Sequence, residues 1–184
     1  MPDTNSFARS LHDLGLAAWF GGSLMGAIGL NGAAAKASDP AERSRIATAG
    51  WTRWAPVNAV AIGAHLVGGA VIVKANKGRI TGQANVASHT GVKAALTAAA
   101  LAATAASGVF GTKVARGADA PTAGATEPSS GTPADVASAQ RNLQVAQWAI
   151  PALTGAVLVM SARMGEQQRP GQVGAGLVKR LLPS

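Results

Sequence analysis

The stretch VNAVAIGAHLVGGAVIV, residues 57–73, decides the fold, because it is almost entirely apolar and holds one histidine, His65, near its centre. It belongs to a longer segment, residues 54–73, that contains no Asp, Glu, Lys or Arg. A helix of about 20 apolar residues spans the roughly 30 Å hydrocarbon core of a bilayer. The stretch therefore predicts a transmembrane helix that carries an imidazole close to the middle of the membrane.

Three more segments of similar length also lack charged residues. They cover residues 14–35, 94–112 and 142–162. A soluble, alanine-rich helical bundle is the alternative, but its helices would carry charges on their outer faces, and charged residues make up only 13% of this 184-residue chain. The alternation of apolar and polar residues that a membrane barrel needs is also missing. We therefore predict an all-α, polytopic membrane protein, a single domain over residues 1–184 built as an antiparallel bundle of four transmembrane helices.

The first segment has a competing interpretation as a cleaved signal peptide, since the run AAAK at residues 33–36 resembles a small-residue cleavage site. However, the apolar segment 14–35 is longer than the roughly 7–15 residues of a signal-peptide core. The residues before it are not clearly basic either, because Arg9 is offset by Asp3 and Asp13. We expect this segment to be retained as the first span.

An amphipathic segment, residues 40–53, follows the first span. Asp39 and Pro40 stand at the N-cap and N1 positions of a helix start. Trp51 and Trp54 carry side chains that are typical of the headgroup region of a membrane. We therefore predict a short interfacial helix over residues 40–53, between the first two spans.

The remaining connections are polar. Residues 115–132 are rich in Ala, Gly, Pro, Ser and Thr, a composition typical of flexible chain, so we predict a flexible loop there and a tail over residues 165–184. With four spans, the side that holds both termini carries nine of the 16 Lys and Arg, and this excess predicts that the side is cytoplasmic. The expected location is a bacterial plasma membrane, with several spans and with both termini in the cytoplasm.

Composition excludes several classes of function. The chain has no cysteine, so disulfides, thiol catalysis and cysteine-based zinc sites are ruled out. Its net charge of +8 is spread over loops and tails beside the apolar segments, which is the pattern of membrane-flanking charge rather than of nucleic-acid binding. Phosphate-binding loops, nucleophile elbows and paired carboxylates are missing from the sequence. We expect no catalytic residues and no nucleic-acid partner.

Small residues stand where helices are expected to pack closely. Gly22 and Gly26 form a GxxxG pattern in the first span, and Gly69 lies on the same stripe as His65. Such residues let helix backbones approach each other in lipid, within one chain or between two copies. Pro151 in the fourth span is predicted to kink its helix. In the third span, small residues recur every four positions at Ala95, Ala99, Ala103, Ser107 and Gly111.

Polar residues recur near the centres of all four charge-free segments. If each segment is centred on the bilayer midplane, Ser23, Thr104 and Thr154 lie within about 3 Å of the level of His65. A hydroxyl of this polar layer is then expected to hydrogen-bond the imidazole and join the helices. Two functional roles for His65 stay open beside this structural one: a place in a proton or small-substrate pathway, and ligation of haem or a metal.

The other two histidines, His12 and His89, lie just outside the first and third segments, on the side predicted to be cytoplasmic. The same centring places His65 about 15 Å from them. We therefore expect His12 and His89 to approach each other at the membrane surface, as the candidate cofactor ligands. No metal site is predicted, because a four-coordinate metal would be short of ligands.

The segment LHDLGLAAWFGGSLMGAIGL, residues 11–30, carries a pattern of His12, Trp19, Gly21 and Gly22, and the amphipathic RSRIATAGWTRW and a second span follow it. This pattern resembles the first half of small, uncharacterised bacterial four-helix membrane proteins that are loosely related to the CopD-type copper-resistance domain. The likeness covers residues 8–73. It implies a four-helix inner-membrane protein and, for CopD-like members, metal or haem handling, although methionine-rich and histidine-rich metal motifs are missing here.

The function that these patterns favour is that of a small integral membrane protein, not an enzyme and without a resident cofactor. We expect a structural or accessory component that associates through its small-residue helix faces. Its partners are then the lipid bilayer and either a second copy of the chain or a larger membrane complex. Two alternatives are a CopD-like protein that handles haem or a metal, and a minimal transporter or proton conductor that uses His65.

Overall fold

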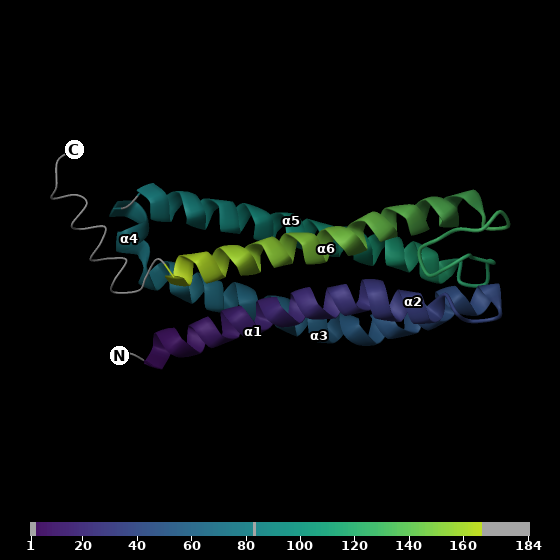
Figure 1. The fold of residues 1–184 in the computed structure, drawn as a ribbon, viewed down its shortest axis with the longest axis horizontal. Helices are drawn as coiled ribbons and strands as arrows, with labels where there is room; N and C mark the ends of the chain where they lie inside the picture. The colour runs from purple at the N-terminus through teal and green to yellow at the C-terminus, as the bar shows by residue number, and fades with distance from the viewer. Residues whose placement is uncertain (1–2, 83, 167–184) are drawn as a thin grey trace.

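The structure is a computed structural model that describes residues 3–82 and 84–166, and all its regular elements are helical. Four long helices dominate the bundle (Figure 1). The first is interrupted near its end by a π-helical turn, in which hydrogen bonds reach one residue further than in an α-helix. The elements are α1 (Asp3–Met25), η1 (Gly26–Leu30), α2 (Asn31–Ala34), α3 (Pro40–Ala75), α4 (Lys77–Gly82), α5 (Ala84–Arg116) and α6 (Ala134–Glu166).

The long helices form two antiparallel pairs. α1, with η1 and α2, packs along α3, and α5 packs along α6, while α1 also contacts α6 and so joins the two pairs. The contact between α3 and α5 is sparse. Figure 1 shows that the N-terminus and α4 lie at one end of the bundle, whereas α2 and the loop between α5 and α6 lie at the other.

Four helices are long and apolar enough to cross a membrane, which confirms the predicted helix count for the described part of the chain. In each helix, the apolar stretch continues into polar turns at one or both ends, so the helices extend beyond the charge-free segments. They cover Asn5–Ala34, Pro40–Ala75, Val86–Arg116 and Ala134–Arg163.

The predicted helix start at Asp39 is confirmed, but the separate interfacial helix is not. The Asp39 side chain accepts a hydrogen bond from the backbone N–H of Ala41 at 2.9 Å, and Pro40 begins α3. From there α3 runs without a break to Ala75, through Pro56. The end of a charged segment at Arg53 marks a change in surroundings and does not break the helix, which continues even through Pro56.

The two tryptophans expected at headgroup depth pack inside the helix pair. A Cβ atom added at Gly22 would overlap the ring of Trp54, and one added at Gly26 would overlap the ring of Trp51. The GxxxG pattern of α1 and η1 is therefore occupied by side chains of α3. It holds one chain together and is not left open for a second copy.

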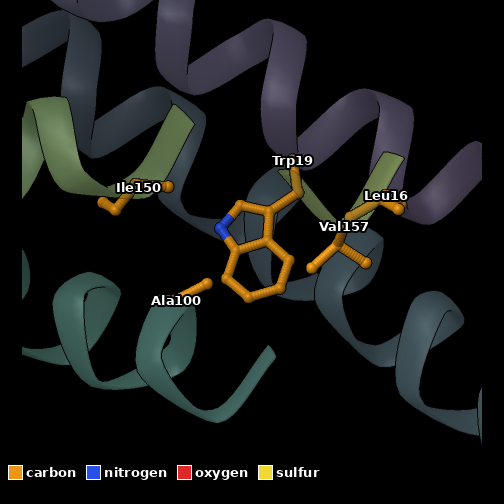
Figure 2. Packing of buried hydrophobic residues seen from close by; sticks show 5 residues of the cluster. All are labelled: Leu16, Trp19, Ala100, Ile150 and Val157. Atoms are coloured by element: carbon orange, nitrogen blue, oxygen red, sulfur yellow. The ribbon is translucent and has the colours of Figure 1, made fainter. Parts of the chain in front are cut away.

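The apolar core lies where α1 meets α5 and α6. Trp19 of α1 is fully buried, and Figure 2 shows its indole among Leu16, Ala100, Ile150 and Val157. Its Nε1–H donates to the Thr104 hydroxyl at 3.2 Å. One large side chain thus joins the two helix pairs by packing and by a hydrogen bond.

The segment predicted as a flexible loop, residues 115–132, is folded over the end of the bundle. Its first two residues belong to α5, and Thr122, Ala125 and Thr126 are buried. The Arg43 side chain donates to the carbonyl oxygen of Thr122 at 3.0 Å. Contacts with α3 position the segment in this structure, and its flexibility stays a prediction from composition. The tail predicted over residues 165–184 lies almost wholly outside the described residues.

Candidate functional site

His12 of α1 and His65 of α3 form a stacked pair in the interior of the protein. Their ring centroids are 4.0 Å apart and the ring planes differ by 18°. Both side chains are buried, with exposed fractions of 7% and 2%. The two histidines of the first helix pair, which lie 53 positions apart in sequence, are thus brought into direct contact.

Each imidazole also bonds the backbone of the other helix. Nδ1 of His12 lies 2.9 Å from the carbonyl oxygen of His65, and Nδ1 of His65 lies 3.0 Å from the carbonyl oxygen of His12. A carbonyl oxygen only accepts hydrogen bonds, so the proton of each ring sits on Nδ1. The result is a reciprocal clasp in which each ring donates to the residue that carries the other.

Lys93 of α5 completes the cluster. Its ammonium Nζ lies 3.1 Å from Nε2 of His12 and donates to it. This fits the Nδ1–H form of His12, since Nε2 is then free to accept. A single neutral imidazole thereby joins α1, α3 and α5.

Glycine makes the close approach of α1 and α3 possible. A Cβ atom at Gly15 would lie 2.6 Å from the backbone N of His65, and one at Gly68 would lie 2.6 Å from the backbone N of His12. Both distances are shorter than real Cβ contacts allow. The backbones therefore touch on both sides of the stacked rings.

A repeated motif underlies this geometry. Ala8, His12 and Gly15 in α1 have the same spacing as Ala61, His65 and Gly68 in α3, an Ala-x3-His-x2-Gly pattern in both. Because the helices are antiparallel, the two copies face each other across an approximate two-fold axis. Sequence reasoning considered the histidines one at a time and missed this pairing, although the repeated spacing was the available signal.

The prediction that His65 lies about 15 Å from His12 is wrong, and so is the polar layer around His65. The residues facing each other in α1 and α3 are fixed by the turn that joins them, not by the centres of their charge-free segments. Ser23 is 11 positions beyond His12 on the first helix, which corresponds to about 16 Å. The hydroxyls of Thr104 and Thr154 donate to the carbonyl oxygens of Ala100 and Ile150 in their own helices.

The expected approach of His89 to His12 stays a prediction, while Lys93 contacts His12 from the same helix. Nε2 of His12 is bound by Lys93, one helical turn beyond His89 on α5. Gly69, which was placed on the His65 stripe, does lie against this cluster, since a Cβ there would be 3.2 Å from Nδ1 of His12. Pro151 lies inside α6, which continues through it.

The arrangement suits a structural role for the pair. Two axial ligands of a haem would direct ring nitrogens at one iron from opposite sides, whereas these rings are stacked face to face with centroids 4.0 Å apart. No group of three or more His, Asp or Glu side chains that could hold a metal is found within residues 3–82 and 84–166. The rings also share no hydrogen bond, so no proton can pass directly from one to the other.

Comparison with known proteins gives no relative: no family model, curated protein or solved structure matches this chain. The likeness of residues 8–73 to CopD-related proteins stays a prediction from the motif alone. Three of the four residues of that motif have a packing role within the chain, whereas Gly21 has open space around it. His12 stacks on His65, Trp19 fills the core, and Gly22 lies under Trp54.

Proposed function

We propose that this chain is a multi-pass protein of a bacterial plasma membrane, with both termini in the cytoplasm, and that it is a structural or accessory component rather than an enzyme. The four long apolar helices support membrane insertion. The beginning of α1, the α4 turn and the end of α6 lie at one end of the bundle (Figure 1). In the sequence of a four-span chain, the N-terminal segment, the second connection and the C-terminal segment together carry nine of the 16 Lys and Arg, which favours a cytoplasmic position for their side.

The histidine clasp supports a structural role over the alternatives. A proton pathway through His65 needs a neighbour that can exchange a proton with its ring, and the ring donates to a backbone carbonyl instead. Haem or metal handling needs ring nitrogens directed at a common ligand position, whereas the two rings are stacked on each other and Nε2 of His12 is engaged by Lys93. We therefore infer that the pair fixes how α1 and α3 cross.

The outward face of α5 carries the proposal of an accessory role. Only 6% of the most apolar 18-residue stretch of α5 is buried inside the protein, compared with 33% of the corresponding stretch of α6. The exposed residues of its middle turns are nearly all small, at Ala94, Ala98, Ala102 and Ala105. Small residues bring helices together in lipid, so we propose that a transmembrane helix of a partner membrane protein packs on this face.

This face differs from the predicted stripe on the same helix. Ala95 and Ala99 are exposed, whereas Ala103, Ser107 and Gly111 turn toward the protein interior and are half-buried. A spacing of four residues advances about 400° around a helix of 3.6 residues per turn. Such a stripe therefore drifts by about 40° per step, from the outer to the inner face.

The test is to enlarge the outward face and to measure association in the membrane. Ala98→Leu and Ala102→Leu should lower the yield of cross-linked complex at least ten-fold, because a larger side chain keeps a partner helix away. The matched control is Ala17→Leu, which changes an exposed alanine of α1. Equal cross-linking in all variants, or a monomer without any cross-linked partner, would contradict the proposal; a complex made only of copies of this chain would identify the partner as a second copy.

A further inference from the structure

A narrow cavity of about 390 Å³ runs between α3 and α5, where contact between these two helices is sparse. Its deep end lies at Ser23 of α1 and Thr104 of α5, near the centres of the charge-free segments 14–35 and 94–112. The loop residues Ala125 and Thr126 line its other end. The cavity therefore extends from the middle of the bundle to the end that holds the loop between α5 and α6.

The length of the cavity matches the depth of one membrane leaflet. Its lining on α5 extends from Thr104 to Ala115, which corresponds to about 16 Å along the helix. One leaflet takes up half of the roughly 30 Å hydrocarbon core, about 15 Å. In the proposed orientation, the cavity thus crosses the leaflet opposite to the cytoplasm and runs parallel to the lipid tails.

The cavity is too narrow to admit another helix. Its volume, divided by this length, gives a mean cross-section of about 24 Å². A helix with its side chains, about 10 Å in diameter, has a cross-section of roughly 80 Å². An unbranched hydrocarbon chain, which is one methylene wide, is the membrane component that fits a slot of this width and length.

The accessible surface of the cavity is mostly apolar, although many of its residues carry hydroxyl or amide groups. Several of these groups bond within the protein and need no partner in the cavity. The hydroxyls of Thr104 and Thr112 donate to carbonyl oxygens of their own helix at 2.8 and 2.9 Å. Trp51 donates from Nε1 to Oδ1 of Asn31 at 2.9 Å. Among the described residues that line the cavity, none is charged, so a charged group inside it would lack a partner.

The cavity opens sideways, between the outer edges of α3 and α5. Thr52 and Ala55 on α3 line it and are exposed, as are Gly108 and Thr112 on α5. In a bilayer these edges face hydrocarbon. An empty slot there would forfeit van der Waals contacts along both of its walls, so a neighbouring lipid tail is the expected occupant.

We propose that the cavity holds one acyl chain of a phospholipid from the surrounding leaflet, and this inference rests on the membrane insertion proposed above. The phospholipid brings only methylene groups into the cavity and leaves its headgroup at the membrane surface. The bound tail contacts both walls and so joins α3 to α5, which make few contacts with each other. Because lipid tails are as apolar as the protein, shape and packing hold the tail in place.

Two glycines allow the cavity to be filled without a clash inside the protein. Gly108 and Gly111 line it, and a Cβ added at either would meet no atom within 4 Å. Leucine at either position would therefore take up space that the tail needs. Gly91, on the same helix, has equally open space but does not line the cavity, so Gly91→Leu is the matched control.

The chain's own tryptophans report on the tail. Trp51 and Trp54 line the cavity, whereas Trp19 is fully buried in the core. Trp148 is 49% exposed on α6 and would respond to any surrounding lipid, so Trp148→Phe serves as the background for all variants. The full chain is placed in nanodiscs of phosphatidylcholine brominated near the middle of its tails, because bromine quenches indole fluorescence only over short distances.

Quenching is measured relative to nanodiscs of the same lipid without bromine. It should fall at least two-fold in Gly108→Leu and in Gly111→Leu and stay unchanged in Gly91→Leu. Native mass spectrometry in mild detergent then identifies what is retained: one phospholipid per chain in Gly91→Leu, and several-fold less in Gly111→Leu. Since leucine is a better helix former than glycine, Gly111→Leu should not lower the Tm, which checks folding separately.

Several outcomes would overturn the proposal. They are equal quenching in the three glycine variants, no retained phospholipid, a free fatty acid in its place, and a dimer whose yield falls in Gly111→Leu, which would show that a second copy closes the cavity. Release of the chain from membranes by alkaline washing would refute membrane insertion itself, whereas equal quenching in a chain that stays in the membrane would refute only the tail site. Ala98→Leu, on the outward face of α5, should leave the quenching unchanged, so the two surfaces of α5 are tested separately.

Discussion

Each histidine of the clasp supplies the donor that a carbonyl oxygen on the opposite helix needs. His12→Ala or His65→Ala therefore removes one hydrogen bond, the stacking contact and the partner of a buried carbonyl. We expect each substitution to lower the free energy of unfolding by about 1–3 kcal/mol. The measurement is reversible unfolding in mixed micelles, with Leu14→Ala, an exposed residue of the same helix, as the control.

The double variant His12→Ala/His65→Ala should cost less than the sum of the two single variants, because the second substitution removes contacts that the first has already broken. We expect a coupling of at least about 0.5 kcal/mol, as for residues in direct contact. Strictly additive effects would mean that the rings do not depend on each other.

Glycine at the helix crossing gives a second prediction at the level of single residues. Gly15→Ala and Gly68→Ala each place a methyl group against backbone atoms that cannot rotate away. We expect each to destabilise the protein by about 2 kcal/mol or more. Gly63→Ala in α3 has open space instead and should stabilise the helix by up to about 1 kcal/mol. Thermal unfolding of the three variants checks this, and equal shifts would contradict the close approach.

At the scale of elements, the loop between α5 and α6 is bonded by several side chains of α3 and α6, and Arg43 is one of them. Arg43 donates to the carbonyl oxygens of Thr122 and Ala123 at 3.0 and 3.2 Å, and also to that of Ala37 at 3.0 Å. Arg43→Ala should release the loop and increase its rate of proteolytic cleavage at least several-fold. Arg53→Ala, at an exposed position of the same helix, is the control. A loop that is cleaved equally fast in the wild type would show that these contacts do not order it.

The helices themselves were largely predictable from the sequence. Their ends were predictable only where residues with a strong capping preference mark them. Asp39 and Pro40 specify the start of α3 through their own chemistry. The position of residues 117–133 was not predictable, because it depends on contacts with other elements, such as the hydrogen bond from Arg43, which is far away in sequence. The continuity of α3 past Arg53 was missed for a related reason, since charge reports the surroundings of a residue and not the path of its backbone.

At the scale of the whole molecule, the proposed orientation predicts which connections are accessible from each side. A single cysteine at Ser129 in the loop should react with an impermeant thiol reagent added to intact cells, because that loop lies at the end opposite to the N-terminus. A cysteine at Lys77 in α4 should react only after the cells are opened. The chain has no cysteine of its own to interfere. The reverse pattern would invert the topology, and labelling of both sites in intact cells would argue against membrane insertion.

The number of long helices was predictable from four charge-free segments, but their mutual register was not. Hydropathy measures the depth of each helix independently, whereas the contact of His12 with His65 depends on how two helices are aligned. That alignment follows from the short turn before Asp39 and from the glycines at the crossing. The cavity between α3 and α5 was unpredictable for the same reason, since it arises from two helices that do not touch closely.

The two-fold crossing of α1 and α3 has a consequence for biosynthesis. The two faces carry the same Ala-x3-His-x2-Gly motif, so at the histidine crossing a second α1 would present the same residues as α3 does. This crossing, however, requires the two helices to be antiparallel. Newly synthesised chains that insert into a bilayer all place their first helix in the same orientation. The sidedness of insertion would therefore prevent newly made molecules from pairing through this face until their own α3 has emerged.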